Sequence, residues 1–311
     1  MHRLRVAVIG VGHLGQHHAR LLAAMEHVEL VGVVDTKAGR AEEIAAKYGT
    51  RAFASATDVR SLVDAVTVAV PTESHVDVAL PFVEQGSAVL VEKPLASSLA
   101  DADRLIDAAR RRGGVLAAGH TERFNPAVAA VLPVLSNPRF IEVHRLGVFP
   151  ERSLDIDVVF DLMIHDLDLL LASVRTDVVS VEAVGVHVLS SRTDIANARL
   201  RFASGCIANL TASRISRERV RKARFFQQDA YISVDFASQD VEIYRTIFEG
   251  DGRPSIQGGK LEVAKDEPLR LELADFVDAA RNRRAPRVPA QAGRDALALA
   301  TRIAEEMEAA L

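Results

Sequence analysis

A glycine-rich turn near the start of the chain constrains the fold more than any other feature. Gly10, Gly12 and Gly15 follow the spacing G-x-G-x-x-G, directly after an apolar run at 4–9 and before an amphipathic stretch with helical spacing. In a strand–turn–helix unit, the first glycine permits a tight turn, the second lets the backbone approach a pyrophosphate, and the third lets the helix pack on the strand. The turn therefore predicts a dinucleotide-binding unit.

The residues around this turn predict how the dinucleotide is held. His13 and Leu14 lie inside the turn, where we expect them beside the phosphates at the start of the helix. Asp35 ends the second apolar run, where a carboxylate accepts hydrogen bonds from an adenosine ribose. Because the same carboxylate repels a 2′-phosphate, NAD is favoured over NADP. Lys37 and Arg40 follow closely and partly offset its charge.

The first 120 residues repeat one pattern, a β-branched apolar run followed by a turn and an amphipathic stretch. Strands are expected at 4–9, 30–35, 65–70, 88–92 and 115–119, and helices near 13–25, 39–47, 73–85 and 98–112. Strands that alternate with helices form a parallel sheet, because parallel neighbours need a long crossover. We therefore assign residues 1–122 to an α/β Rossmann domain, a doubly wound parallel sheet.

The pattern changes after residue 125. Helices are expected over 126–135 and 158–173, a strand over 139–148, strand-like alternation over 178–248, a surface loop over 249–260 and closing helices over 267–283 and 291–310. Successive strands without intervening helices favour a largely antiparallel open sheet. Because a single core stops growing at about 250–300 residues, we assign 123–311 to a second α/β domain for substrate binding and oligomerisation.

Composition limits the partners. The 38 Lys and Arg against 42 Asp and Glu give a formal net charge of −4, so no attraction to nucleic acid or to an anionic membrane is built into the whole chain. Cys206 is the single cysteine, which suits a reducing compartment. No apolar run approaches the roughly 18 residues of a membrane span, and we expect a cytoplasmic protein.

Lys93 is the first candidate for catalysis. It follows Glu92 and precedes Pro94 at the end of a predicted parallel strand, and ligands in open α/β sheets bind beyond the carboxyl ends of the strands. An ammonium at such a position is costly unless it is partnered. The alternative is a surface lysine that pairs with Glu92.

Asp161 and His165 are the second candidate. They stand four residues apart in a predicted apolar helix and therefore share a face. A carboxylate beside an imidazole fixes the tautomer and raises the basicity, as a general base for alcohol oxidation requires. A metal site that also includes Asp168 is the alternative; because hydride transfer needs no metal, we expect none.

Four motifs occur together in one order along the chain, and together they resemble the Gfo/Idh/MocA oxidoreductases. They are Gly10-x-Gly12-x-x-Gly15, Pro71-Thr72-x-x-His75, Glu92-Lys93-Pro94 and Asp161-x-x-x-His165. The resemblance implies a dehydrogenase of CH–OH groups that uses NAD(P), with Lys93, Asp161 and His165 as catalytic residues. It also implies a homodimer or homotetramer and a set of cofactor contacts. That set contains Val70, Pro71, Thr72, His75, Glu92 and Lys93.

Two shorter segments bear on the substrate. Residues 120–126 and 157–166 resemble those of UDP-N-acetylglucosamine 3-dehydrogenases, which implies oxidation of the 3-hydroxyl of a nucleotide sugar. The cation-rich segment 214–224 suits a diphosphate, because arginine's planar fork matches phosphate oxygens; a solvated hairpin face or an oligomer contact is the alternative. The expected substrate contacts are Lys93, His120, Arg123, Asn125, Asp161, His165 and Arg214.

Other functions share this fold. A dehydrogenase of a free polyol or sugar, such as an inositol, would keep the chemistry and change the substrate. A dinucleotide-binding regulator without turnover has no need of an acid–base group, so Lys93, Asp161 and His165 argue against it. A reductase like biliverdin reductase would not explain the pair of Asp161 and His165.

Overall fold

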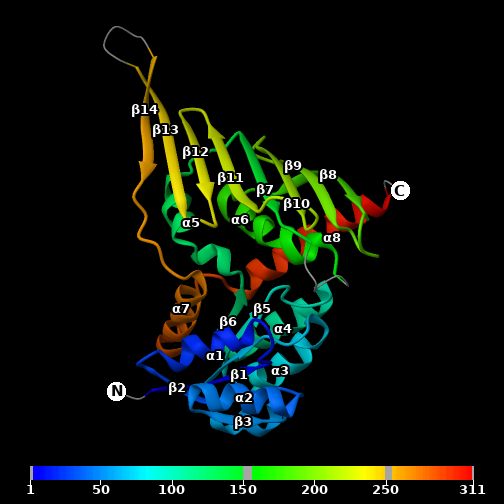
Figure 1. Cartoon of the computed structure of the whole chain (residues 1–311), viewed down its shortest axis with the longest axis vertical. Helices are drawn as coiled ribbons and strands as arrows, with labels where there is room; N and C mark the ends of the chain where they lie inside the picture. The colour runs from blue at the N-terminus through cyan, green and yellow to red at the C-terminus, as the bar shows by residue number, and fades with distance from the viewer. Residues whose placement is uncertain (1–2, 150–155, 249–253, 310–311) are drawn as a thin grey trace. The chain divides into compact units, whose positions relative to one another are not determined.

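The chain forms two compact units. The computed structural model describes residues 3–149, 156–248 and 254–309. One unit combines Met1–Thr121 with Leu269–Asp295, and the other combines Glu122–Pro268 with Ala296–Leu311. Figure 1 shows the elements of each. No described helix is long and apolar enough to cross a membrane.

A six-stranded parallel sheet forms the centre of the first unit, in the order β3-β2-β1-β4-β5-β6. The strands are β1 (Leu4–Ile9), β2 (Val28–Val34), β3 (Arg51–Phe53), β4 (Ala65–Val68), β5 (Ala88–Glu92) and β6 (Leu116–Gly119). Residues of β4 and β5 are buried throughout, because helices cover both faces of such a sheet. The predicted parallel Rossmann sheet is confirmed. The three residues of β3 are too few to show a strand pattern in the sequence.

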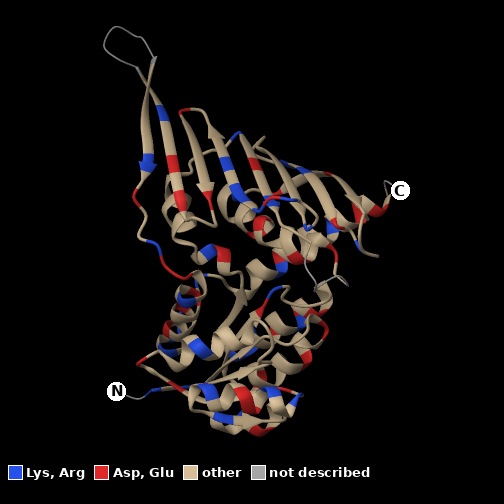
Figure 2. Ribbon diagram, viewed as in Figure 1, with Lys and Arg blue, Asp and Glu red and all other residues tan. Residues whose placement is uncertain are grey.

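Helices follow most strands of this unit. They are α1 (Gly15–Ala23), α2 (Ala38–Tyr48), α3 (His75–Gln85), α4 (Leu99–Arg112) and α7 (Pro268–Asn282), with short 3₁₀ turns η1 (Ala56–Leu62), η2 (Thr72–Ser74) and η3 (Thr121–Phe124), the last of which lies at the unit boundary. Lys, Arg, Asp and Glu residues occur along these helices (Figure 2), and the buried residues of α4, for example, are all apolar. The helices therefore bury one apolar face and leave a charged face in water.

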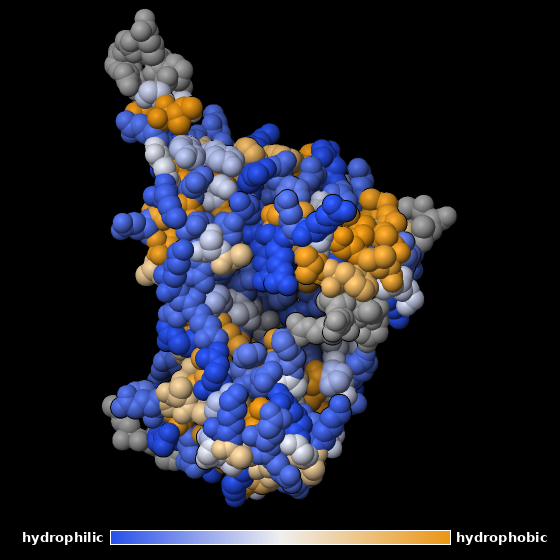
Figure 3. Space-filling model, in the orientation of Figure 1, coloured by the Kyte–Doolittle hydropathy of each residue, from blue (hydrophilic) through white to orange (hydrophobic). Residues whose placement is uncertain are grey.

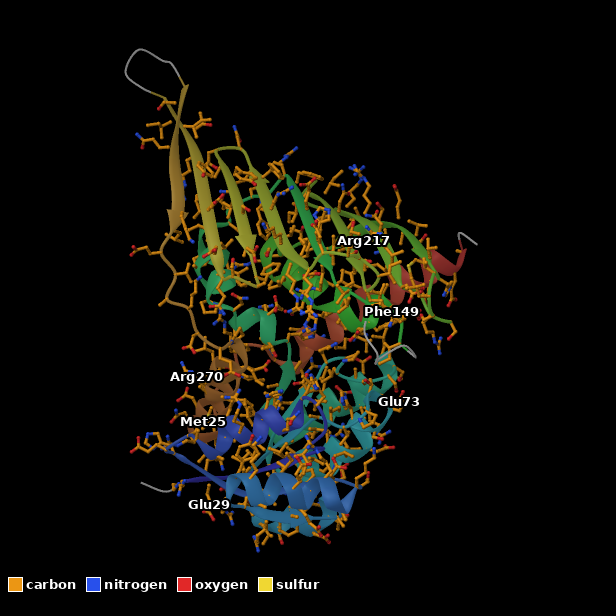
Figure 4. The ribbon with its side chains drawn as sticks, in the orientation of Figure 1. Met25, Glu29, Glu73, Phe149, Arg217 and Arg270 are labelled. Carbon is orange, nitrogen blue, oxygen red and sulfur yellow. The ribbon has the colours of Figure 1, made fainter. Side chains whose placement is uncertain are left out.

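The segment 269–295 was expected in the second domain, but the structure groups it with the first unit. Leu273 and Phe276 of α7 join the apolar cluster that contains Leu22 of α1. Met25, labelled in Figure 4, packs against the same cluster. The sequence pattern of this segment predicts its helix but does not indicate that the helix packs on the N-terminal unit.

The second unit is built on an eight-stranded sheet in the order β14-β13-β12-β11-β7-β10-β9-β8. The strands are β7 (Phe140–Leu146), β8 (Val178–Val186), β9 (Ile195–Phe202), β10 (Ile207–Ser213), β11 (Val220–Gln227), β12 (Ala230–Asp235), β13 (Asp240–Phe248) and β14 (Pro254–Leu261). Strands β7 and β10 run parallel, and the other described neighbours run antiparallel. The predicted, largely antiparallel sheet is confirmed.

The expected loop at 249–260 is wrong for residues 254–260, which lie in β14; residues 249–253 lie outside the described residues. Two of the glycines that suggested a loop, Gly258 and Gly259, lie in this strand. Gly258 has φ 146°, and a Cβ on it would lie 2.0 Å from the carbonyl oxygen of Ile243 on β13. Only glycine permits so close an approach of two backbones.

Helices pack on one face of this sheet. They are α5 (Pro126–Val131), the 3₁₀ turn η4 (Leu132–Val134), the π turn η5 (Val159–Met163), α6 (Ile164–Val174) and α8 (Ala290–Ala309), of which residues from 296 onward belong to this unit. Met163, Leu167 and Ile303 share one core with alternate residues of the strands, such as Val143 and Leu210. The intervening strand residues are more exposed, as in β9 and β10.

The close approach of Gly15 to Gly10 within the glycine turn predicts that Gly15→Ala destabilises the protein. A Cβ at Gly15 would lie 1.8 Å from the carbonyl oxygen of Gly10, a backbone atom that cannot rotate away. We expect a loss in the free energy of unfolding of about 3 kcal/mol, measured by urea denaturation. Gly12→Ala is the matched control, because nothing lies within 4 Å of its Cβ position, and its change should stay below about 1 kcal/mol. Equal losses in both variants would contradict this account of the turn.

Candidate active site

The glycine turn between β1 and α1 is closed on one side and open on the other. Gly10 has φ 84°, and a Cβ there would lie 2.7 Å from the carbonyl oxygen of Ala69. At Gly12 the same position is empty to 4 Å, and Gly12, His13 and Leu14 are exposed. Leu14 makes no side-chain cap on α1, and the positive end of that helix lies at the open side of the turn, where it favours an anion. The turn fits the pyrophosphate of a dinucleotide.

Asp35 stands beside this turn at the end of β2. Its Oδ2 accepts the N–H of Val11 at 3.0 Å and its Oδ1 accepts the N–H of Lys37 at 2.9 Å. Arg40 donates to the carbonyl oxygen of Val11 and pairs with Glu43 at 2.7 Å, so part of its charge is already balanced. Because each carboxylate oxygen has two lone pairs, Asp35 retains acceptor positions for a ribose.

The strand end that carries Lys93 is organised by a buried carboxylate. Glu92 is 5% exposed; its Oε1 lies 3.0 Å from Nε2 of His18, and its Oε2 accepts the N–H of Lys93 at 3.2 Å. Burial raises the pKa of Glu92, but the hydrogen bond from His18 and the charge of Lys93 outweigh it, so the pKa lies below its ordinary value. Lys93 itself is half-buried. Glu92, predicted as a cofactor contact, serves within the protein.

His75 also faces the protein. It is 1% exposed, and its Nδ1 and Nε2 lie 2.8 Å and 2.9 Å from the carbonyl oxygens of Pro94 and Val70. Burial lowers the pKa of His75, although both carbonyl oxygens act in the opposite sense. This ring thus joins the segment after β4 to the residue after Lys93, whereas the sequence predicted a cofactor contact. Pro71, the residue after Val70 and another predicted cofactor contact, is exposed.

His120 is a further predicted site residue that the structure buries. It follows β6 and is 1% exposed. A Cβ on Gly293 would lie 3.7 Å from its Nε2, so the two residues are close neighbours within the first unit. The contact of His120 with a substrate stays a prediction.

Asp161 and His165 lie at the start of the apolar helix of the second unit. Asp161 belongs to the π turn η5 and His165 to the first turn of α6, and both are half-buried. The π turn shows in the N–H of Ile164, which donates to the carbonyl oxygen of Val159. Such turns are frequent at functional sites. The predicted helix is confirmed, with a local widening that the apolar spacing did not indicate.

Arg214 supports this helix and is not exposed for a substrate. It is 2% exposed, donates to the carbonyl oxygens of Ile156 and Thr193, and lies 3.2 Å from the carboxylate of Asp194. It therefore holds the backbone that leads into η5. The predicted substrate contact of Arg214 stays a prediction, and the structure shows this role within the protein beside it.

Some of the remaining cations of the segment 214–224 are paired with carboxylates, and Arg217 is exposed. Lys222 and Arg224 on β11 pair with Asp235 and Glu142, each at 3.4 Å. Arg217 is exposed on the connection between β10 and β11 (Figure 4). That connection is hydrogen-bonded to the segment after β7, because the N–H of Ser216 donates to the carbonyl oxygen of Gly147. Only part of the segment is thus open to an anion.

Arg123 and Asn125, two further predicted substrate contacts, also hold the second unit together. Arg123 pairs with Asp168 of α6 at 3.2 Å. Asn125 is 1% exposed; it caps α5 by accepting the N–H of Ala127, and it donates to the carbonyl oxygen of Phe236. Asp168, which the metal alternative included with Asp161 and His165, is the partner of Arg123. Among the described residues, no group of three or more His, Cys, Asp and Glu could hold a metal ion.

A buried charge network beside His165 was not predicted. Arg145 of β7 lies 2.7 Å from Asp166 and 3.3 Å from Glu122. Burial raises the pKa of Asp166 against the opposing charge of Arg145. An acidic residue inside an apolar helix is the signal that could have indicated such a partner, because a buried charge must be paired.

Known proteins show the same organisation. Residues 4–120 match the family described as oxidoreductase family, NAD-binding Rossmann fold, and residues 143–233 match the GFO/IDH/MocA C-terminal domain. The UDP-N-acetylglucosamine 3-dehydrogenase of Acidithiobacillus ferrooxidans is 41% identical over 100% of this chain and 99% of that protein. A solved structure of that enzyme has a TM-score of 0.93 and covers 99% of both chains.

More distant relatives share the same fold. The scyllo-inositol 2-dehydrogenase (NAD(+)) of Bacillus subtilis is 26% identical over 92% of this chain and 88% of that protein. A levoglucosan dehydrogenase in complex with NADH and levoglucosan has a TM-score of 0.88 at 17% identity, covering 98% of this chain and 97% of that one, and shows the fold alone. With the glycine turn, the strand end at Lys93 and the matches over both units, the chain belongs to the Gfo/Idh/MocA oxidoreductase family.

Proposed function

We propose that this oxidoreductase converts the 3-hydroxyl of UDP-N-acetylglucosamine, or of a closely related nucleotide sugar, to a ketone with NAD. The observation that carries the proposal is 41% identity over the full length to an enzyme of that activity. The inositol dehydrogenase that matches most of the chain is 26% identical. Substrate preference depends on many residues across a chain, so the relative with the higher identity is the better guide.

The proposed chemistry uses three residues. His165 accepts the proton of the sugar hydroxyl as general base, and Asp161 orients its ring. The ammonium of Lys93 stabilises the negative charge that develops on the oxygen. When bound, the nicotinamide of NAD would supply the hydride acceptor. The half-buried positions of all three residues support these roles, since a reactive group must be both accessible and shielded.

NAD is the proposed cofactor in preference to NADP. Asp35 places a carboxylate beside the glycine turn, bound to the N–H of Val11, where a 2′-phosphate would meet a like charge. Arg40, one of the two cations that follow Asp35 in the sequence, is held by Val11 and Glu43. Both observations favour a ribose with a free 2′-hydroxyl.

The uncovered face of the eight-stranded sheet is the proposed contact between subunits of a dimer or tetramer. Exposed apolar residues gather on β8 and just after it, as Figure 3 shows. They are Val179, Val184, Val186, Val188 and Leu189. A patch of this kind marks an interaction site.

Sedimentation velocity tests this contact and should show a species of at least twice 33.7 kDa. Val184→Lys places a charge in the patch and should shift the protein toward the monomer. A monomeric wild type would contradict the proposal. A cytoplasmic location stays a prediction.

The substrate proposal predicts a selective activity profile. UDP-N-acetylglucosamine should reduce NAD with a kcat/KM at least tenfold above that of free N-acetylglucosamine, myo-inositol or scyllo-inositol. The same panel with NADP should be slower for every substrate. The measurement is the absorbance of NADH at fixed enzyme concentration. Preference for an inositol would establish the polyol dehydrogenase instead, and preference for NADP would overturn the role of Asp35.

The catalytic proposal predicts separate effects on turnover and on cofactor binding. His165→Ala should lower kcat by about 10² to 10⁴, and Lys93→Met should also lower it steeply. Both variants should bind NADH within a few fold of the wild type, measured by fluorescence titration, because the glycine turn and Asp35 are unchanged. His144→Ala, at a half-buried histidine on β7, is the matched control. Near-normal turnover by His165→Ala would remove the general-base assignment.

A further inference from the structure

Two buried histidines contact the residues on either side of Lys93. His18 of α1 is 0% exposed, and its Nε2 lies 3.0 Å from Oε1 of Glu92. His75, the first residue of α3, is 1% exposed, and its Nδ1 lies 2.8 Å from the carbonyl oxygen of Pro94. The two rings come from different helices of the first unit. Together they restrain both neighbours of the lysine.

The surroundings of His18 indicate which of its ring nitrogens donates a hydrogen bond. Its Nδ1 is buried and has no hydrogen-bond partner among the described residues. A proton on Nδ1 would be a buried donor without an acceptor, which is costly, whereas an unused lone pair costs less. The proton therefore belongs on Nε2, where it is donated to the carboxylate of Glu92. The ring thus donates to a charged acceptor, a strong kind of hydrogen bond.

The side chain of Glu92 is restrained by a second hydrogen bond and by the packing of the neighbouring strand. Its Oε2 accepts the N–H of Lys93 at 3.2 Å. On the neighbouring strand, a Cβ on Gly119 would lie 3.0 Å from both the Cα and the Oε2 of Glu92, so β6 packs directly against it. If His18 lost its donor, the carboxylate would have to move or take up a proton. Either change alters its bond to the backbone of Lys93.

His75 completes the restraint from the other side. Its Nε2 lies 2.9 Å from the carbonyl oxygen of Val70, and its Nδ1 faces Pro94. The ring therefore joins the chain after β4 to the chain after β5. The contacts of Glu92 before it and of Pro94 after it therefore restrain the backbone of Lys93 from both sides.

We propose that His18 and His75 are positioning residues that fix Lys93 at the end of β5 for catalysis. The inference rests on the proposed role of Lys93 in turnover. His18 lies three residues after Gly15, so the helix that opens at the dinucleotide turn also sets the place of the lysine. The binding of the dinucleotide itself uses the turn and Asp35. The N–H of His18 donates to the carbonyl oxygen of Leu14 in the turn at 3.3 Å, whereas its side chain bonds to Glu92, so a change of the ring leaves the backbone contact in place.

The first test compares substitutions that keep or remove the donor. His18→Gln retains an N–H near the position of Nε2 and should keep kcat within about threefold of the wild type. His18→Leu should lower kcat by ten- to a hundredfold, with the dissociation constant of NADH within threefold. His27→Leu is the matched control, at an exposed histidine just after α1. All rates are divided by the fraction of protein that binds NADH, which removes any loss due to misfolding.

The second test does not depend on the sugar. Lys93 is labelled with an amine-selective reagent, and its labelling rate is measured by peptide mass spectrometry against that of the exposed Lys47. His18→Leu should change the ratio at least fivefold, and His18→Gln and His27→Leu should not. If His18→Leu does not fold, the pair of His75→Asn and His75→Leu takes its place, since asparagine keeps a donor toward Pro94.

The outcomes separate this inference from the proposed function. An unchanged labelling ratio and unchanged kcat in the leucine variants would overturn the positioning role. An equal loss of kcat in His18→Gln and His18→Leu would also overturn it, because the hydrogen bond would then be irrelevant. A changed ratio in an enzyme whose wild type turns over no nucleotide sugar would support the positioning of Lys93 and reject the proposed substrate.

Discussion

The carboxylate of Glu92 is buried, and its need for hydrogen-bond donors organises the part of the first unit that matters for function. A charge removed from water must be paired, and Glu92 obtains its donors from His18 and from the backbone of Lys93. One donor lies on the helix that opens at the glycine turn, and the other belongs to the candidate catalytic residue. The dinucleotide turn and the lysine are therefore held by the same buried group.

Buried charges also support the candidate base in the second unit. Arg214 binds the backbone before η5, and Arg145 pairs with Asp166, the residue that follows His165. Removing one member of such a pair leaves an uncompensated charge and typically costs about 3–5 kcal/mol. The positions of Asp161 and His165 thus depend on arginines that need not touch a substrate. Substitutions at these arginines should be interpreted as effects on folding before they are interpreted as effects on binding.

The sequence predicts the secondary structure and the type of each sheet, but it does not predict which polar side chains are buried. The parallel sheet, the glycine turn and the antiparallel second sheet follow from local periodicity, and the structure confirms them. The roles of Arg214, Asn125 and Glu92 could not be predicted, because a polar side chain near a motif has the same sequence signal whether it faces a ligand or caps a helix. The strand β14 and the return of α7 to the first unit depend on pairing and packing between distant residues, which local patterns do not contain.

The central claim is that hydride leaves the sugar carbon that bears the 3-hydroxyl and arrives on the nicotinamide. It is tested most directly with UDP-N-acetylglucosamine that carries deuterium at C3, incubated with the enzyme and unlabelled NAD. Mass spectrometry of the reduced nicotinamide cofactor should show one deuterium per turnover, and substrate labelled at C2 should transfer none. Reduced cofactor without deuterium from C3, formed at a normal rate, would contradict the account.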